Sequence, residues 1–88
     1  MASPESHLAK AIRFARVYAE MSPEDLALTI HMAPSEISRL ERGDRKPRYD
    51  TMMRLADGLG VLCWQLVWLA QQLEAGVRAD DLIWPPPD

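Results

Sequence analysis

Hydrophobic residues recur along most of the chain with the spacing of three and four that is typical of amphipathic helices. The first such stripe predicts a helix over residues 6–20; its members are Leu8, Ala11, Ile12, Ala15 and Ala19. No segment alternates polar and apolar residues as a half-buried strand would. We therefore expect an all-α protein.

The start of a second helix is marked by three consecutive kinds of signal. Ser22 can cap a helix, and Pro23 suits the first helical position, where its missing N–H costs nothing. Asp25, two residues further on, resembles the carboxylate of a capping box. Together they predict a helix over residues 23–30.

Only the short turn 31–33 precedes another proline at a first helical position, Pro34. This predicts a third helix over residues 34–42, which Gly43 ends because glycine readily takes a positive φ. His31, in the turn, stands where a positive φ is tolerable for its residue type.

Two further helices are predicted, over residues 49–58 and 62–75, and the three prolines at 85–87 cannot continue a helix. The fold class expected is a compact five-helix domain. We divide the chain into residues 1–76, whose last helix serves dimerisation, and an acidic, proline-rich tail, 77–88.

The composition fits one small globular domain of 88 residues, 48% of them hydrophobic and 26% charged. The single cysteine, Cys63, excludes an intramolecular disulfide and fits a reducing compartment. We see no signal peptide, and the longest apolar stretch is shorter than the roughly 20 residues that span a bilayer. We expect a cytoplasmic protein with no membrane association.

Charge is distributed unevenly along the chain. Residues 61–88 carry one arginine against four acidic residues, which accounts for the whole net charge of −3. Residues 39–54 contain six basic side chains against three acidic ones: Arg39, Arg42, Arg45, Lys46, Arg48 and Arg54. A local basic patch followed by an acidic tail indicates a polarised molecule, although a solvated surface would look the same.

Residues 8–67 resemble the Cro/lambda-repressor type of helix-turn-helix domain, the XRE family. The resemblance rests on Ser-Pro-Glu-Asp-Leu-Ala at 22–27, Ile-Ser-Arg-Leu-Glu-Arg-Gly at 37–43, and Pro47 with the segment 51–61. It implies a lambda-repressor-like fold and a dimeric DNA-binding transcriptional regulator encoded by a bacterium or phage. By the same analogy, Arg16 would pair with Glu41 and fix the crossing of the first and third helices.

The physical basis of such a motif is that a tight turn joins two short helices so that the second helix protrudes from the surface. That helix can then enter the DNA major groove, which is about 12 Å wide. Ile37 and Leu40 would anchor the third helix from below. The outward residues expected to read bases are Ser35, Glu36, Ser38 and Arg39, with Arg39 first because guanidinium pairs with guanine.

Glu36 leaves two possibilities open, since its carboxylate can accept from cytosine N4 or simply repel DNA. Phosphate contacts are expected from the end of the third helix and the following loop, at Arg42, Arg45, Lys46 and Arg48. Ser22 and Pro23, at the positive end of the second helix, are further candidates.

Three positions depart from the family pattern. Pro23 replaces the usual glutamine, Ala33 replaces a capping Ser or Thr, and Pro34 stands where a polar residue often reads a base. These changes, with the negative charge of Glu36, predict modest affinity or specificity that depends on few bases and on DNA shape.

Ten of the thirteen residues from 61 to 73 are hydrophobic, more than one buried stripe requires. We expect the surplus to form a two-fold dimer interface through Leu62, Trp64, Trp68, Leu69, Leu82, Ile83 and Trp84. The alternative is that the tail folds back and covers these tryptophans within one chain.

No constellation of residues suggests catalysis. His7 and His31 are isolated and Cys63 has no neighbouring ligand residue, so no metal site is indicated. We therefore expect no enzyme activity, no cofactor and no metal. The leading hypothesis is a dimeric regulator, most simply a repressor, that binds an operator in double-stranded DNA. The alternative is a protein-interaction module or antitoxin that binds a partner protein through its tryptophan-rich helix and tail.

Overall fold

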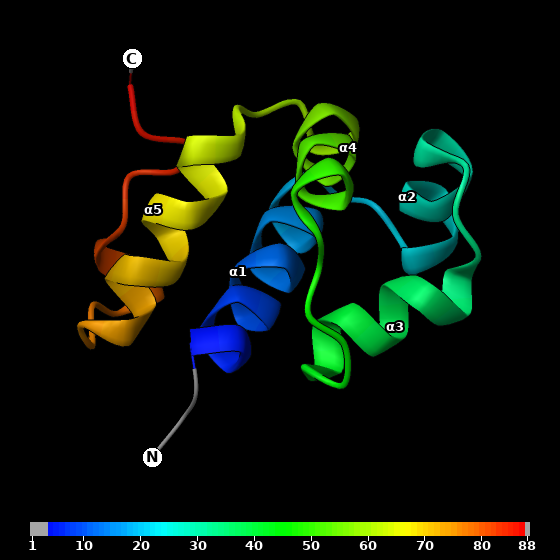
Figure 1. Ribbon diagram of the computed structural model, residues 1–88. Coiled ribbons are helices and arrows are strands. Elements are labelled where there is room, and N and C mark those ends of the chain that lie inside the picture. The colour runs from blue at the N-terminus through cyan, green and yellow to red at the C-terminus, as the bar shows by residue number, and fades with distance from the viewer. Residues whose placement is uncertain (1–3, 88) are drawn as a thin grey trace.

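The structure, a computed structural model, describes residues 4–87 of the chain. Five α-helices follow one another, with one turn of 3₁₀ helix near the C-terminus (Figure 1). Their bounds are α1 Pro4–Tyr18, α2 Pro23–Ile30, α3 Pro34–Arg42, α4 Tyr49–Leu59, α5 Cys63–Glu74 and η1 Ala79–Asp81. The described residues contain no strand. The predicted all-α, five-helix fold class is confirmed.

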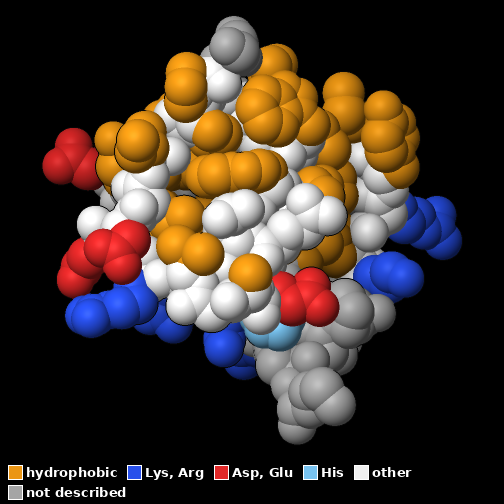
Figure 2. All heavy atoms as spheres, turned by 90° about the vertical axis from the view of Figure 1, so that its left-hand side faces the viewer, with side chains coloured by type: hydrophobic (Ala, Val, Ile, Leu, Met, Phe, Trp, Pro, Cys, Tyr) orange, Lys and Arg blue, Asp and Glu red, His pale blue; other side chains and the backbone are white. Residues whose placement is uncertain are grey.

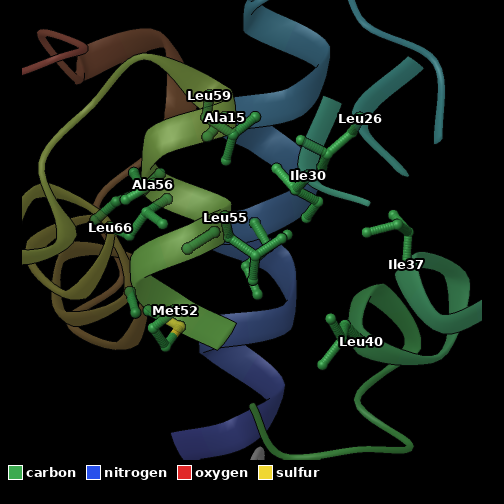
Figure 3. Packing of buried hydrophobic residues seen from close by; sticks show 14 of the residues in the cluster. Ala15, Leu26, Ile30, Ile37, Leu40, Met52, Leu55, Ala56, Leu59 and Leu66 are labelled. Atoms are coloured by element: carbon green, nitrogen blue, oxygen red, sulfur yellow. The ribbon is translucent and has the colours of Figure 1, made fainter. Parts of the chain in front are cut away.

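The hydrophobic core forms where α1 packs against α3, α4 and α5, and where α2 packs against α3 and α4. Figure 3 shows side chains of α2, α3 and α4 directed toward one another across this centre. Ile12, Leu26, Ile37, Leu55 and Leu66 are almost completely excluded from solvent. Each such side chain contributes about 1.5–3 kcal/mol of hydrophobic stabilisation.

Every α-helix ends in the same way, on a residue in the left-handed conformation. The N–H of that residue and the N–H of the next one both donate back to carbonyls of the last helical turn. Three of these residues are glycines, and the other two are Glu20 with φ 59° and His31 with φ 58°. The turn at Glu20 explains why α1 ends at Tyr18 rather than at residue 20 as predicted.

Gly58 allows α4 to approach α2 closely. A Cβ atom at this position would overlap Cγ2 of Ile30 and would lie 3.2 Å from Cδ1 of Leu26. Since both neighbours belong to the core, a side chain here would push the two helices apart.

The tail after α5 returns along the domain and completes its core. Trp84 is only 7% exposed, and its ring meets the ring of Phe14 edge to face, with 6.2 Å between the centroids. Gln65, itself buried, fastens the tail further along: its Nε2 donates to the carbonyl of Pro86 at 2.9 Å. Its Oε1 accepts from the N–H of Leu62 at 2.8 Å, at the start of α5. The tail therefore belongs to the same packed unit as residues 4–76.

This path of the tail changes the picture of the predicted dimer interface. Leu69 is fully buried, and Trp84 lies in the core, so neither is available to a partner in this conformation. The remaining residues of that prediction are more accessible: Trp68 and Leu82 are half-buried, whereas Leu62, Trp64 and Ile83 are exposed by 51%, 47% and 74%. The tail does fold back onto its own domain, as the alternative predicted. It buries its own Trp84, however, and leaves Trp64 half exposed.

Within residues 4–87 no helix has the length and hydrophobicity needed to cross a membrane. The same part of the chain contains no group of His, Cys, Asp or Glu side chains arranged to hold a metal ion.

Replacing Trp84 with alanine tests whether the tail is part of the core. We expect the Trp84→Ala variant to lose about 3–5 kcal/mol of unfolding free energy, because a large aromatic side chain leaves a cavity. Chemical denaturation followed by circular dichroism measures this. Leu28→Ala is the control, since Leu28 is 80% exposed, and it should change stability by no more than about 0.5 kcal/mol. Equal stability of the two variants would contradict the packing of the tail.

Candidate nucleic-acid interface

The two helices α2 and α3, with the turn 31–33 between them, form the helix-turn-helix arrangement predicted from the sequence. The turn is made by His31, whose φ of 58° and ψ of 48° reverse the chain direction within one residue. Figure 1 shows α3 at the edge of the molecule, on the side away from α5. The third helix and the apolar C-terminal part of the chain therefore lie on different sides of the molecule.

A capping box closes the start of α2. Ser22 Oγ accepts from the N–H of Asp25 at 3.0 Å, and Asp25 Oδ2 accepts from the N–H of Ser22 at 3.1 Å. Hydrogen bonding from Ser22 to the Asp25 carboxylate, first from its backbone N–H and then from its hydroxyl, lowers the pKa of the Asp25 carboxyl. The cap engages the Ser22 hydroxyl, Pro23 has no N–H, and Glu24 and Asp25 add negative charge. This helix end is consequently a poorer phosphate site than Ser22 and Pro23 suggested.

The α3 helix is anchored by two side chains on its inner side, Ile37 at 0% exposure and Leu40 at 2%. The four residues expected to read bases lie on its remaining surface: Ser35 and Arg39 are exposed, and Glu36 and Ser38 are partly exposed. Arg39 makes no ion pair within residues 4–87. Its guanidinium is therefore available to an external acceptor.

The four basic residues expected to bind phosphates are all exposed, at the end of α3 and in the loop that follows. Arg42 and Arg45 each have an acidic neighbour: Arg42 Nε lies 2.9 Å from Asp44 Oδ2, and Arg45 Nη1 lies 3.5 Å from Glu36 Oε2. All four side chains in these pairs are at least 42% exposed, so each pair contributes at most about 1 kcal/mol.

Between α3 and this loop lies an open cleft of about 370 Å³. Its lining includes Glu36 on one wall and the basic segment 45–48, with Arg48 at its end, on the other. The basic loop and the outward face of α3 thus form one continuous surface.

The orientation of α3 depends on a buried ion pair between Arg16 of α1 and Glu41. Nε of Arg16 lies 2.6 Å from Oε2, and its Nη2 donates to Oε1 at 2.9 Å, which makes the pair bidentate. Nη1 donates to the carbonyl of Met21 at 2.7 Å. The two side chains are only 11% and 9% exposed. The hydrogen bond to Glu41 raises the pKa of Arg16 further above its ordinary value.

Arg54 of α4 has a structural role that the sequence analysis did not assign. Its Nη2 donates to the carbonyls of Ile30 and His31, the latter at 3.1 Å, at the C-terminal end of α2. A cation suits this negative end of the helix dipole. From the sequence, Arg54 was counted in the basic patch. In the structure its side chain instead points toward the turn between α2 and α3.

The start of α3 shows the consequences of Ala33 and Pro34. Ala33 makes no side-chain hydrogen bond to the first turn, and Pro34 occupies the first helical position without an N–H. The N-terminal end of α3 therefore offers fewer polar groups than the family pattern provides, as the sequence predicted.

The helix-turn-helix family model matches residues 12–62, which is more than half of the chain, and the chain belongs to this family. It is an XRE-type helix-turn-helix protein, a class of DNA-binding transcription regulators. No curated protein sequence gives a significant match.

Two solved structures share the fold. One, described as the clp gene regulator ClgR from C. glutamicum, has a TM-score of 0.79 and 20% sequence identity, and the match covers 83% of this chain and 95% of that one. A second structure of ClgR, from Corynebacterium glutamicum, gives a TM-score of 0.78 and 22% identity over 85% of this chain and 83% of that one. At this level of identity the likeness establishes the fold and its five-helix arrangement.

Removing Glu41 tests the buried ion pair. We expect the Glu41→Ala variant to lose about 3 kcal/mol of unfolding free energy, because Arg16 keeps its charge in a buried position without its partner. The double variant Arg16→Met, Glu41→Leu should lose less, since it leaves no unpaired charge. Denaturation of the parent and the two variants at neutral pH compares their unfolding free energies.

The matched control is Asp44→Ala, which removes the exposed pair with Arg42 and should change stability by less than about 1 kcal/mol. If Glu41→Ala were no more destabilising than Asp44→Ala, the pair would not hold α3.

Proposed function

We propose that this protein is a cytoplasmic transcriptional repressor that binds an operator in double-stranded DNA as a dimer, with α3 in the major groove. The observation that carries the proposal is the outward side of α3. It presents the unpaired Arg39 beside small polar side chains and is continuous with the basic loop 43–48. This combination supplies both a group that reads bases and groups that contact phosphates.

Base reading is assigned first to Arg39, with Ser35, Glu36 and Ser38 as its neighbours. An exposed arginine on a helix in the major groove can donate two hydrogen bonds to guanine O6 and N7. Glu36 lies 3.5 Å from Arg45 in an exposed pair, and once a phosphate displaces this pair, its carboxylate is able to accept from cytosine N4.

Phosphate binding is assigned to Arg42, Arg45, Lys46 and Arg48. The exposed pairs of Arg42 and Arg45 with acidic neighbours are weak, so a phosphate can displace them. Since this exchange lowers the net gain, we expect modest affinity with a steep dependence on salt.

Dimer formation is assigned to the apolar side of the molecule that carries α5 and the tail. Figure 2 shows hydrophobic side chains gathered over this side. Leu62, just before α5, and Trp64 and Val67 of α5 are exposed by 51%, 47% and 44%. A two-fold dimer formed through this side would present its two α3 helices to half-sites one DNA turn, about 34 Å, apart.

The alternative of a protein-interaction module that works through a free tail is less favoured. Trp84 is buried and Gln65 binds the carbonyl of Pro86, so these two positions of the tail are held by their own domain. A repressor needs no such partner, because a dimer on an operator blocks access to the DNA by itself.

Substitution of Arg39 and Lys46 separates base reading from phosphate binding. Arg39→Ala should reduce discrimination at one base position by about 1–3 kcal/mol. Lys46→Ala should weaken binding to all sequences alike and lower the slope of log affinity against log salt by about 1. Selection of bound duplexes from a random pool, followed by titration at several salt concentrations, measures both effects.

Arg78→Ala provides the control for loss of one positive charge, because Arg78 lies on the tail and is 79% exposed. It should leave base preference and salt dependence unchanged. An unchanged base preference in Arg39→Ala would remove the assignment of α3 as the reading element.

A further inference from the structure

A second apolar surface lies on the outer side of α1. It is a shallow groove of about 510 Å³ whose floor is formed by Phe14, Val17 and Tyr18. The rings of Phe14 and Tyr18 lie nearly parallel, with 6.5 Å between their centroids. Lys10 and Arg13 form its basic rim, and neither makes an ion pair within residues 4–87.

The tail of the same chain borders this groove but does not fill it. Trp84 reaches the edge of the groove by packing on Phe14. The tail is extended just before it, at Leu82, with φ −88° and ψ 138°. Since successive side chains of an extended segment point to opposite sides, Ile83 faces away when Trp84 faces in. Ile83 is accordingly 74% exposed.

The exposed part of the tail carries groups that complement those of the groove. Two carboxylates, Asp80 and Asp81 in η1, precede the apolar Ile83. Asp80 makes only a weak pair with Arg78 at 3.9 Å, with both side chains almost fully exposed. An apolar anchor flanked by carboxylates matches an apolar floor flanked by two cations.

We infer that the occupant of the α1 groove is the tail of a second copy of this chain, with Ile83 on the apolar floor and Asp80 and Asp81 against Lys10 and Arg13. The groove and the tail are neighbours on each protomer, so a two-fold axis between them makes the contact twice, each copy giving its tail and receiving the other's.

The size of the interface supports this reciprocal contact. A stable interface buries about 800 Å² on each partner. The three partly exposed side chains at the start of α5 offer a smaller area than this, even with an aromatic ring among them. They are Leu62, Trp64 and Val67. The groove and the tail add apolar area together with four ion pairs, which also specify how the copies are oriented.

Paired charge reversals test the contact. One variant reverses the groove, Lys10→Glu with Arg13→Glu, and another reverses the tail, Asp80→Lys with Asp81→Lys. Each protein alone opposes like charges twice, and its self-association, measured by sedimentation, should weaken by about 100-fold. An equimolar mixture of the two aligns opposite charges at both contacts and should restore the dimer.

Asp44→Lys, a reversal at an exposed position in the loop after α3, is the control and should dimerise as the parent does. Circular dichroism of each variant verifies the fold. A parent protein that stays monomeric, variants that dimerise normally, or a mixture that fails to associate would each overturn the inference. The inference rests on the proposed dimeric mode of binding. The measurement contains no DNA, however, so its failure would leave the assignment of α3 to DNA untouched.

Discussion

The geometry of the candidate interface depends on one buried guanidinium, that of Arg16. A buried charge is costly unless it is paired and hydrogen-bonded, and here the three nitrogens of one side chain meet three acceptors. Two of these are the carboxylate oxygens of Glu41, and the third is the carbonyl of Met21. Arg16 thus joins α1, the turn before α2 and the end of α3. Apolar contacts from Ile37 and Leu40 hold α3 against the core, but the directional bonds fix how it is turned.

The two turns that flank α2 are stabilised in the same way, by an arginine from another helix. Glu20 and His31 are left-handed without being glycine, a conformation that costs about 1–2 kcal/mol each. Beside each turn an arginine from another helix donates to backbone carbonyls: Arg16 to Met21, and Arg54 to Ile30 and His31. These bonds offset the strain of the turns. They also connect the position of α2 to α1 and α4, so the helix-turn-helix is held from both ends.

Local signals in the sequence are enough to predict the helices. Pro23, Pro34 and Gly43 mark helix ends by backbone chemistry that needs no tertiary contact, and the bounds of α2 and α3 agree with the prediction. The family resemblance supplied Arg16 with Glu41. What could not be predicted depends on distant contacts: that Arg54 faces α2 rather than DNA, and that the tail returns to bury Trp84. Neither follows from spacing along the chain.

The molecule has two surfaces of different chemistry, a basic one around α3 and an apolar one around α1, α5 and the tail. We propose that the basic surface binds DNA. Amide chemical shifts of the ¹⁵N-labelled protein, titrated with a duplex that it has selected, test this most directly. The account predicts that the largest changes fall on residues 34–48, with residues 63–74 unaffected beyond any change in self-association. Changes centred on α5, with residues 34–48 unmoved, would contradict it.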